Sequence, residues 1–305
     1  QVWLVRATEA PTPASTLIHL AATAIGGFLL IRLAPLWRAV AGQWLIPGIN
    51  LGVVSCAGLF TLVLAAFFAA TQRDIRWALS FALVGQLGYV FLALGMGATV
   101  AAVFHLVVIL FCGMMLFLAA GSVIRGMTLD EGHDNGAFDP YDVFNMGGLG
   151  VRQPVTFYLF LFAGMALAGL PLVTAGFWSR DAILAHVWID YRAIFWVLAL
   201  ASAVTGYGVM RQLGLIFVGR PRSRAAARAI ESTPAMILPL LLLALFILVM
   251  GWAALPDDVP IFGGNWLAVF VGAETTRFAA ESMVMWSALT VVGFSVGFLV
   301  YALRD

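Results

Sequence analysis

Long apolar runs separated by short polar joints dominate the chain. Each run holds about 20 residues or more, the length that an α-helix needs to cross the hydrocarbon core of a bilayer. Apolar and polar residues do not alternate within the runs, as they would in the strands of a membrane β-barrel. The pattern therefore predicts an all-α integral membrane protein, a polytopic bundle of about eight transmembrane helices. The predicted spans are 14–34, 48–70, 75–97, 99–124, 154–188, 192–218, 233–254 and 281–302.

The fifth run is long for a single crossing and carries helix-breaking residues at its centre. Gly169, Leu170 and Pro171 lie in its middle, and Gly176 follows. Proline removes a backbone donor and clashes with the preceding turn, which would leave backbone groups unpaired in lipid. We therefore predict a broken helix over 154–188, interrupted at Leu170 and Pro171.

These elements are expected to form one transmembrane domain over 1–305. Four spans fall within 14–124, and a polar loop covers 128–153. The broken helix follows at 154–188, and three further spans fall within 192–302.

Composition agrees with a membrane protein, because 63% of the residues are hydrophobic and only 10% are charged, against about 25% in soluble domains. All 16 basic residues are arginine. If odd-numbered spans start on one side, most arginines gather there, and the positive-inside rule makes that side the cytoplasm or its equivalent. Residue 1 is then expected inside. The arginines on that side are Arg6, Arg73, Arg76, Arg125, Arg152, Arg220, Arg222, Arg224, Arg228 and Arg304.

The remaining polar segments do not predict a metal or cofactor site in this chain. The acidic loop after the fourth span matches no calcium or zinc spacing, so a solvated loop is the better interpretation. Cys56 and Cys112 lie inside spans and are interpreted as small buried apolar residues. We find no phosphate-binding loop and no haem or iron–sulfur pattern. The loop's ionisable residues are Asp130, Glu131, His133, Asp134, Asp139 and Asp142.

Ionisable and polar groups inside the spans are the candidate functional residues. A charge at the bilayer centre costs at least about 2.5 kcal/mol, so such residues suggest function. Histidine is the most suggestive, since its ordinary pKa of about 6.5 lets it gain and lose a proton under physiological conditions. A neutral histidine that only bonds neighbouring helices is the alternative. Arg211 is near a span end and is expected to snorkel. The candidates for a proton path are His19, His105, Arg180, Asp181, Gln86 and Tyr89.

Several long motifs, in order along the chain, resemble one known family. They are EAPTPASTLIHLAATAIGG at 9–27, TQRDIRWALSFALVGQLGYVFLALG at 71–95, AAVFHL at 101–106, MGGL at 146–149 and ALAGLPLVTAGFWSRDAIL at 166–184. On these motifs the chain resembles the C-terminal part of the antiporter-like membrane subunits of respiratory complex I, of the large distal type. The Mrp-type sodium/proton antiporters share this family.

The resemblance implies a proton relay of histidines and lysines near the membrane midplane. His19 and His105 match two histidines of the family pattern. Ile109 stands where the family has a second histidine and Gly113 where it has the central lysine. His105, Ile109 and Gly113 recur every four residues and form one helical stripe. Arg180 replaces the lysine of the broken helix, and arginine cannot release a proton at ordinary pH.

The expected function is that of a membrane-arm subunit of a complex I-like NADH:quinone oxidoreductase that takes part in, or scaffolds, proton translocation. The resemblance implies no redox chemistry in this chain, with NADH, flavin, iron–sulfur clusters and quinone on partner subunits. Its expected partners are other membrane and redox subunits, the lipid bilayer, and protons carried by internal water, with no nucleic acid. The expected location is the bacterial plasma membrane or an organelle inner membrane.

Two alternatives stay open. The changes at Ile109, Gly113 and Arg180 are compatible with a non-conducting structural subunit. Related membrane subunits also build cation/proton antiporters and inorganic-carbon uptake complexes. The family's earlier spans are missing, which fits either a fragment of a longer polypeptide or a split relative.

Overall fold

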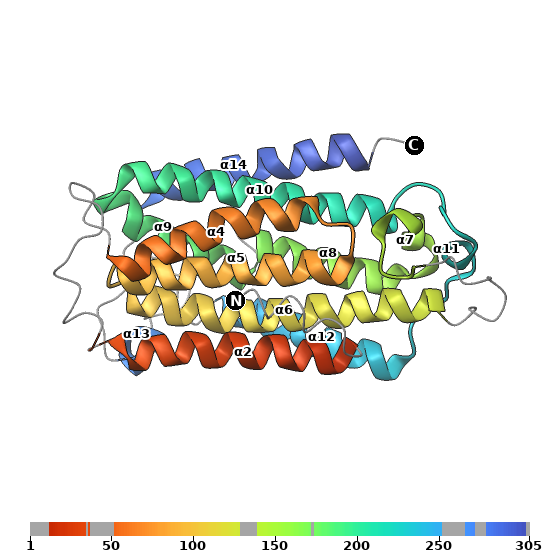
Figure 1. Ribbon diagram of the computed structural model, residues 1–305, viewed down its shortest axis with the longest axis horizontal. Coiled ribbons are helices and arrows are strands. Elements are labelled where there is room, and N and C mark those ends of the chain that lie inside the picture. The colour runs from red at the N-terminus through yellow and green to blue at the C-terminus, as the bar shows by residue number, and fades with distance from the viewer. Residues whose placement is uncertain are drawn as a thin grey trace.

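The computed structural model describes residues 12–34, 36, 52–128, 139–171, 174–251, 266–271 and 279–302. Within these ranges the regular structure is helical. The long helices run roughly parallel to the longest axis of the molecule (Figure 1). The predicted all-α membrane fold is therefore confirmed.

The first four spans are α2, α4, α5 and α6, and the last three are α10, α12 and α14. Among the described residues, α12 is short and the other six are long and apolar enough to cross a membrane. The predicted count of eight is reached when the short α12 and the broken span are included. The bounds are α2 Thr12–Arg32, α4 Val53–Thr71, α5 Ile75–Gly95, α6 Thr99–Thr128, α10 Arg192–Phe217, α12 Pro234–Met250 and α14 Ala280–Tyr301.

The broken helix is present as two halves, α8 (Pro154–Ala168) and α9 (Ala175–Asp190). Gly169 ends α8 with φ +72°, in the left-handed conformation that glycine adopts without strain. Leu170 and Pro171 follow between the two halves. A Cβ atom on Gly176 would collide with the backbone oxygen of Ala166, so the start of α9 packs tightly on the end of α8.

The predicted polar loop at 128–153 needs a correction, because part of it is helical. It contains a 3₁₀ turn, η3 (Val143–Asn145), and α7 (Leu149–Arg152). Asp142 caps η3 by accepting a hydrogen bond from Phe144 N at 2.9 Å. Periodicity missed these elements, as it missed α11 (Arg224–Arg228) and α13 (Trp266–Val271), because they are shorter than two turns. The ionisable loop residues Asp130, Glu131, His133 and Asp134 lie outside the described residues.

The starts of α5, α8 and α12 carry residues that are typical of helix N-termini. The Asp74 carboxylate accepts hydrogen bonds from Arg76 N and Trp77 N at the start of α5. Pro154 and Pro234 occupy the first positions of α8 and α12, where a missing N–H has no cost. Local sequence therefore sets these boundaries.

The helix order places α5 and α6 in the interior, since they are the most buried of the long helices. The bundle extends from α2 on one side to α14 on the other (Figure 1). The end that holds α7 and α11 also collects most of the described arginines, as the alternation of spans predicted. These are Arg73, Arg76, Arg125, Arg152, Arg220, Arg222, Arg224 and Arg228.

Candidate functional site

The candidate residues from the sequence fall into two separate groups. Gln86, Tyr89, His105 and Arg180 lie together, and we call them the Arg180 cluster. His19 lies apart, where it bonds Ser15 and Ser80, and we call these three the His19 cluster. Asp181 is beside Arg180 in sequence but bonds elsewhere.

Arg180, on α9, is fully buried at the break in the helix. Its guanidinium donates from Nη2 to the Leu167 carbonyl oxygen at 2.6 Å, and from Nη1 to the Ala168 carbonyl oxygen. Nη2 also donates to Gln86 Oε1 at 2.9 Å. Carbonyls at the end of a helix lack partners within it and carry partial negative charge. Arg180 therefore caps the C-terminus of α8 from the next half-helix.

The opposite end of α8 meets a negative charge. Glu231 Oε2 accepts from Val155 N at 2.8 Å, and Glu231 Oε1 accepts from the Thr156 hydroxyl at 2.6 Å. A carboxylate at the N-terminus and a guanidinium at the C-terminus both favour the helix dipole. The half-helix α8 is thus stabilised electrostatically at both ends.

His105 and Tyr89 stand beside the buried guanidinium. The Tyr89 ring lies 5.1 Å from Arg180 Cζ and 5.7 Å from the His105 ring. The Tyr89 hydroxyl donates to the Leu198 carbonyl oxygen at 3.0 Å and contacts Ser202 Oγ at 2.8 Å. His105 Nδ1 bonds Ser179 Oγ at 3.0 Å, and its Nε2 has no hydrogen-bond partner within the described part of the chain.

Asp181 does not neutralise Arg180. Among the described residues, no ion pair includes either side chain. Asp181 Oδ1 instead accepts a hydrogen bond of 2.9 Å from Trp286 Nε1 on α14. The partner of Asp181 is thus on another helix, an arrangement that follows from adjacent helical residues pointing in different directions.

His19 has partners on both ring nitrogens. Nδ1 lies 2.7 Å from the Ser15 carbonyl oxygen, so this nitrogen must carry a proton and donate. Nε2 lies 2.9 Å from Ser80 Oγ, which is also 2.7 Å from the Arg76 carbonyl oxygen. The Ser80 hydroxyl has one proton and two acceptors within reach.

The stripe on α6 runs from the Arg180 cluster to the His19 cluster. His105, Ile109 and Gly113 continue to Phe117, whose ring lies 4.8 Å from the His19 ring. Twelve residues separate His105 from Phe117, or about 18 Å along the helix. The position of the family lysine, Gly113, lies between the two clusters.

Apolar side chains fill the middle of this stripe. Ile109 is buried. A Cβ atom on Gly113 would lie 2.6 Å from Leu83 Cδ2 and 3.0 Å from Leu83 Cδ1. Leu83, on α5, therefore occupies the space that a side chain at Gly113 would enter. The two polar clusters are separated by packed hydrocarbon.

A wide cavity of about 500 Å³ opens near the His19 cluster, at the arginine-rich end. Thr12, Arg76, Arg125 and Tyr141 are among the residues that line it. Arg76 is bound to Asp74 at 2.8 Å and stacks on Tyr141. Arg76 also supplies the carbonyl that Ser80 contacts.

Two other arginine predictions can be compared with the geometry. Arg211 is buried and donates to the Gln72 carbonyl oxygen at 2.7 Å, beyond the end of α4. Arg222 donates to the Leu215 carbonyl oxygen at 2.9 Å, and partial burial lowers its pKa. Both side chains tie loops to helix ends.

Sequence reasoning missed several polar residues that complete the clusters. Ser80, Ser179 and Trp286 are partners of predicted residues, and Gln212 is buried with an unpartnered amide. Serine and tryptophan are common in transmembrane helices, so their residue type alone does not mark them. Only the face of the helix on which each one lies could have suggested contact with His19, His105 or Asp181. Within the described residues, no three histidine, cysteine or acidic side chains gather as a metal site would require.

A family model described as "NADH:quinone oxidoreductase/Mrp antiporter, TM" matches residues 1–206. NADH-quinone oxidoreductase subunit L of Escherichia coli (strain K12) is 34% identical over 304 residues, which cover 99% of this chain and 45% of that protein. The chloroplastic NAD(P)H-quinone oxidoreductase subunit 5 of Coffea arabica is 41% identical over 223 residues, covering 72% and 28%. The chain thus spans less than half the length of these relatives.

The fold is also found in a solved structure. A chain in the structure of the Mrp complex from Dietzia sp. DQ12-45-1b superposes with a TM-score of 0.68 at 22% sequence identity. The match covers 99% of the present chain and 32% of the Mrp chain.

Proposed function

Because this chain belongs to the NADH:quinone oxidoreductase/Mrp antiporter transmembrane family, we propose that it is a membrane-arm subunit of a complex I-like NADH:quinone oxidoreductase that takes part in, or scaffolds, proton translocation. The observation that carries the proposal is the Arg180 cluster: a fully buried guanidinium at a broken helix, beside a histidine with an unmatched ring nitrogen. Buried ionisable groups in spans are costly and mark proton or ion pathways. Relatives named as quinone oxidoreductase subunits agree with this assignment.

In this proposal the redox chemistry belongs to other subunits. NADH, flavin, iron–sulfur clusters and quinone bind to partners, and this chain contributes helices to the membrane arm. The host membrane is a bacterial plasma membrane or an organelle inner membrane. Lipid or membrane subunits would cover the apolar side chains that are exposed on α2, α8, α12 and α14.

The His19 cluster can take up a proton without moving. When His19 is neutral, its Nδ1–H donates to Ser15 and the Ser80 hydroxyl donates to Nε2. When His19 is protonated, Nε2–H donates to Ser80 Oγ, and the Ser80 proton turns to the Arg76 carbonyl oxygen. In both states each ring nitrogen of His19 keeps a hydrogen bond, because the Ser80 proton can turn between Nε2 at 2.9 Å and the Arg76 carbonyl oxygen at 2.7 Å.

In the same proposal Arg180 is a fixed positive charge. It binds three oxygens and cannot release its proton at ordinary pH. A fixed positive charge beside an imidazole contributes to the electrostatic field at that ring. Arg180 would therefore tune the field at His105, and protons would pass by histidine and internal water.

Proton flux in reconstituted vesicles that contain the intact assembly tests the active form of the proposal. His19→Ala and His105→Ala should each lower the flux, while His186→Ala serves as a matched control. His186 is half-buried, bonds the Met96 carbonyl oxygen at 3.3 Å and lies outside both clusters. Full flux in both His19→Ala and His105→Ala would eliminate a conducting role.

A non-conducting scaffold is the second candidate, and the packing of Leu83 against Gly113 favours it. Hydrocarbon at this point breaks the connection between the clusters. Removal of the whole chain distinguishes the two roles. A scaffold should leave flux per assembled complex unchanged, whereas a conducting subunit should lower it.

A cation/proton antiporter or an inorganic-carbon uptake complex is the remaining alternative for this family. Purification in mild detergent, followed by mass spectrometry of the partners, addresses it. Flavin and iron–sulfur subunits would support the oxidoreductase, and small membrane subunits alone would contradict it.

A further inference from the structure

Gln212 is a polar side chain in an apolar part of the bundle. It lies on α10 and is 4% exposed, yet neither Oε1 nor Nε2 has a hydrogen-bond partner within the described residues. A buried amide without partners is unfavourable, and native proteins satisfy nearly all such groups with protein or with ordered water. Its position therefore calls for a ligand.

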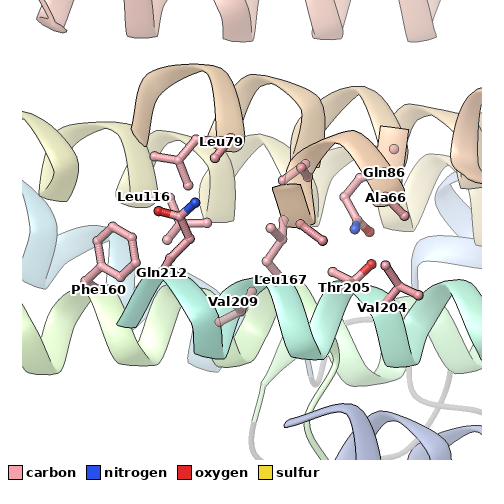
Figure 2. Close-up of a pocket in the computed structure, with 16 residues that line it drawn as sticks. Ala66, Leu79, Gln86, Leu116, Phe160, Leu167, Val204, Thr205, Val209 and Gln212 are labelled. Carbon is pink, nitrogen blue, oxygen red and sulfur yellow. The ribbon is translucent and has the colours of Figure 1, made fainter. Parts of the chain in front are cut away.

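The amide of Gln212 points into a cavity of about 30 Å³ between α4, α5, α6, α8 and α10. Figure 2 shows the amide in a space bounded by Leu79, Leu116 and Phe160. Gln86 and Thr205 line the far end of the same cavity. None of the described residues that line it is charged.

The chemistry of the cavity selects a small neutral molecule that both donates and accepts. The amide offers two donor protons and one acceptor oxygen, and the apolar walls would penalise an ion. A water molecule needs about 10–15 Å³ of such space, so this cavity is large enough for at least one. We propose that Gln212 builds an internal water site between α5, α6, α8 and α10.

The site lies next to the Arg180 cluster by a route that avoids the blocked stripe on α6. Gln86, at the far end of the cavity, accepts from Arg180 Nη2 at 2.9 Å. Gln212 and Thr205 are seven residues apart on α10, or about 10 Å. Water at Gln212 thus starts a path toward Gln86 that passes neither Ile109 nor Gly113. Only this consequence rests on the proposed function.

X-ray hydroxyl-radical footprinting of the protein in lipid nanodiscs, in water enriched in ¹⁸O, tests the water site. Radicals form from water beside a side chain, so buried residues are oxidised only where water is ordered next to them. Phe160 and Leu116 should be oxidised several-fold more than a side chain of equal burial that has no water beside it. Phe195, equally buried against Trp188, is the matched dry control. Oxidation of Phe160 and Leu116 at the Phe195 level would overturn the proposal.

Gln212→Met and Gln212→Asn identify the group that holds the water. The Met variant keeps the length of the side chain but removes the amide, and oxidation at Phe160 and Leu116 should fall to the Phe195 level. The Asn variant keeps an amide and should retain the labelling. Persistent labelling in the Met variant would show that Gln212 does not hold the water. The comparison within the unmodified protein stands even if the Met variant fails to fold.

Proton flux measured on the same preparations separates this inference from the proposed function. Labelling without any flux would keep the water site and refute a conducting role. Flux without labelling would keep the conducting role and refute the water site.

Discussion

The His19 cluster and the Arg180 cluster both bury ionisable groups, but they satisfy them in opposite ways. His19 has a partner on each ring nitrogen, and one of them, Ser80, can reverse its role. Arg180 is held by three oxygens. His105, beside it, has a partner on Nδ1 and none on Nε2 within the described chain.

This difference separates proton acceptance from electrostatic support. A side chain with a reversible partner can change its charge without rearranging its neighbours. A guanidinium that caps a helix end cannot change its charge, and its removal exposes the carbonyls that it satisfies. The two clusters should therefore respond differently to substitution. Loss of Arg180 should lower the stability of the protein strongly, whereas loss of a partner of His19 should lower it only slightly.

Arg180→Met should have the largest effect. It leaves two C-terminal carbonyls of α8 and the Gln86 amide oxygen without a donor, at a cost of about 3 kcal/mol or more. The unfolding temperature in detergent should fall sharply. The unfolding temperature of Arg180→Lys should lie between those of the unmodified protein and Arg180→Met. An ammonium group keeps the charge but lacks the planar geometry to reach three acceptors.

Arg192→Met is the matched control for this change. Arg192 is an exposed arginine at the start of α10 that stacks on Trp188. Its substitution should leave the unfolding temperature nearly unchanged. Equal losses at Arg180 and Arg192 would contradict the capping role.

Much of this fold was predictable because its elements are long. Twenty apolar residues define a membrane span in any context, so the spans from α2 to α14 followed from hydropathy. The broken helix followed from Gly169 and Pro171, whose backbone chemistry is local. Elements such as η3 and α7 did not, because they depend on contacts of the loop with helix ends.

The site was predictable only in part. Intramembrane polarity identified His19, His105, Gln86, Tyr89 and Arg180 without tertiary information. Which residues meet is a property of helix packing, so the separation of His19 from His105 was not expected, and neither was the contact of Asp181 with Trp286. The packing of Leu83 against Gly113 could not be predicted from the sequence, because leucine is the commonest residue type in such helices.

Trp286→Phe should rank second in effect. The ring still packs on Phe177, but Asp181 loses its hydrogen-bond donor in a buried site. We expect a loss of about 2 kcal/mol, seen as a lower unfolding temperature. Trp196→Phe, at an exposed position on α10, is the control. If Asp181→Asn restores the stability of Trp286→Phe, the cost arises from the unpaired carboxylate.

Ser80→Ala should have a smaller effect, because it removes a partner of His19 while the bond to Ser15 remains. The expected loss is about 1 kcal/mol. Ser287→Ala removes a half-buried hydroxyl that bonds the Val284 carbonyl oxygen within α14, and it should cost less. Proton flux in vesicles gives the second measurement: a fall in Ser80→Ala and not in Ser287→Ala supports exchange through Ser80, and equal flux in both argues against it.

Gly113→Ala should have the smallest net effect and is the sharpest test of the barrier between the clusters. Alanine favours the helix by up to about 1 kcal/mol, but its Cβ atom would meet Leu83 at 2.6 Å and force that side chain to shift. We expect these terms to leave a net loss below about 1 kcal/mol. Gly26→Ala, which meets nothing within 4 Å, should gain stability or stay neutral.

The double variant Gly113→Ala/Leu83→Ala isolates the steric term. Because Leu83 is the side chain that would be displaced, Gly113→Ala should cost less in the Leu83→Ala background, with a coupling of at least about 0.5 kcal/mol. Unfolding temperatures of the four proteins in one detergent give this coupling. Additive effects would mean that Leu83 does not close the space at Gly113, and the hydrocarbon barrier between the His19 and Arg180 clusters would then have to rest on Ile109 alone.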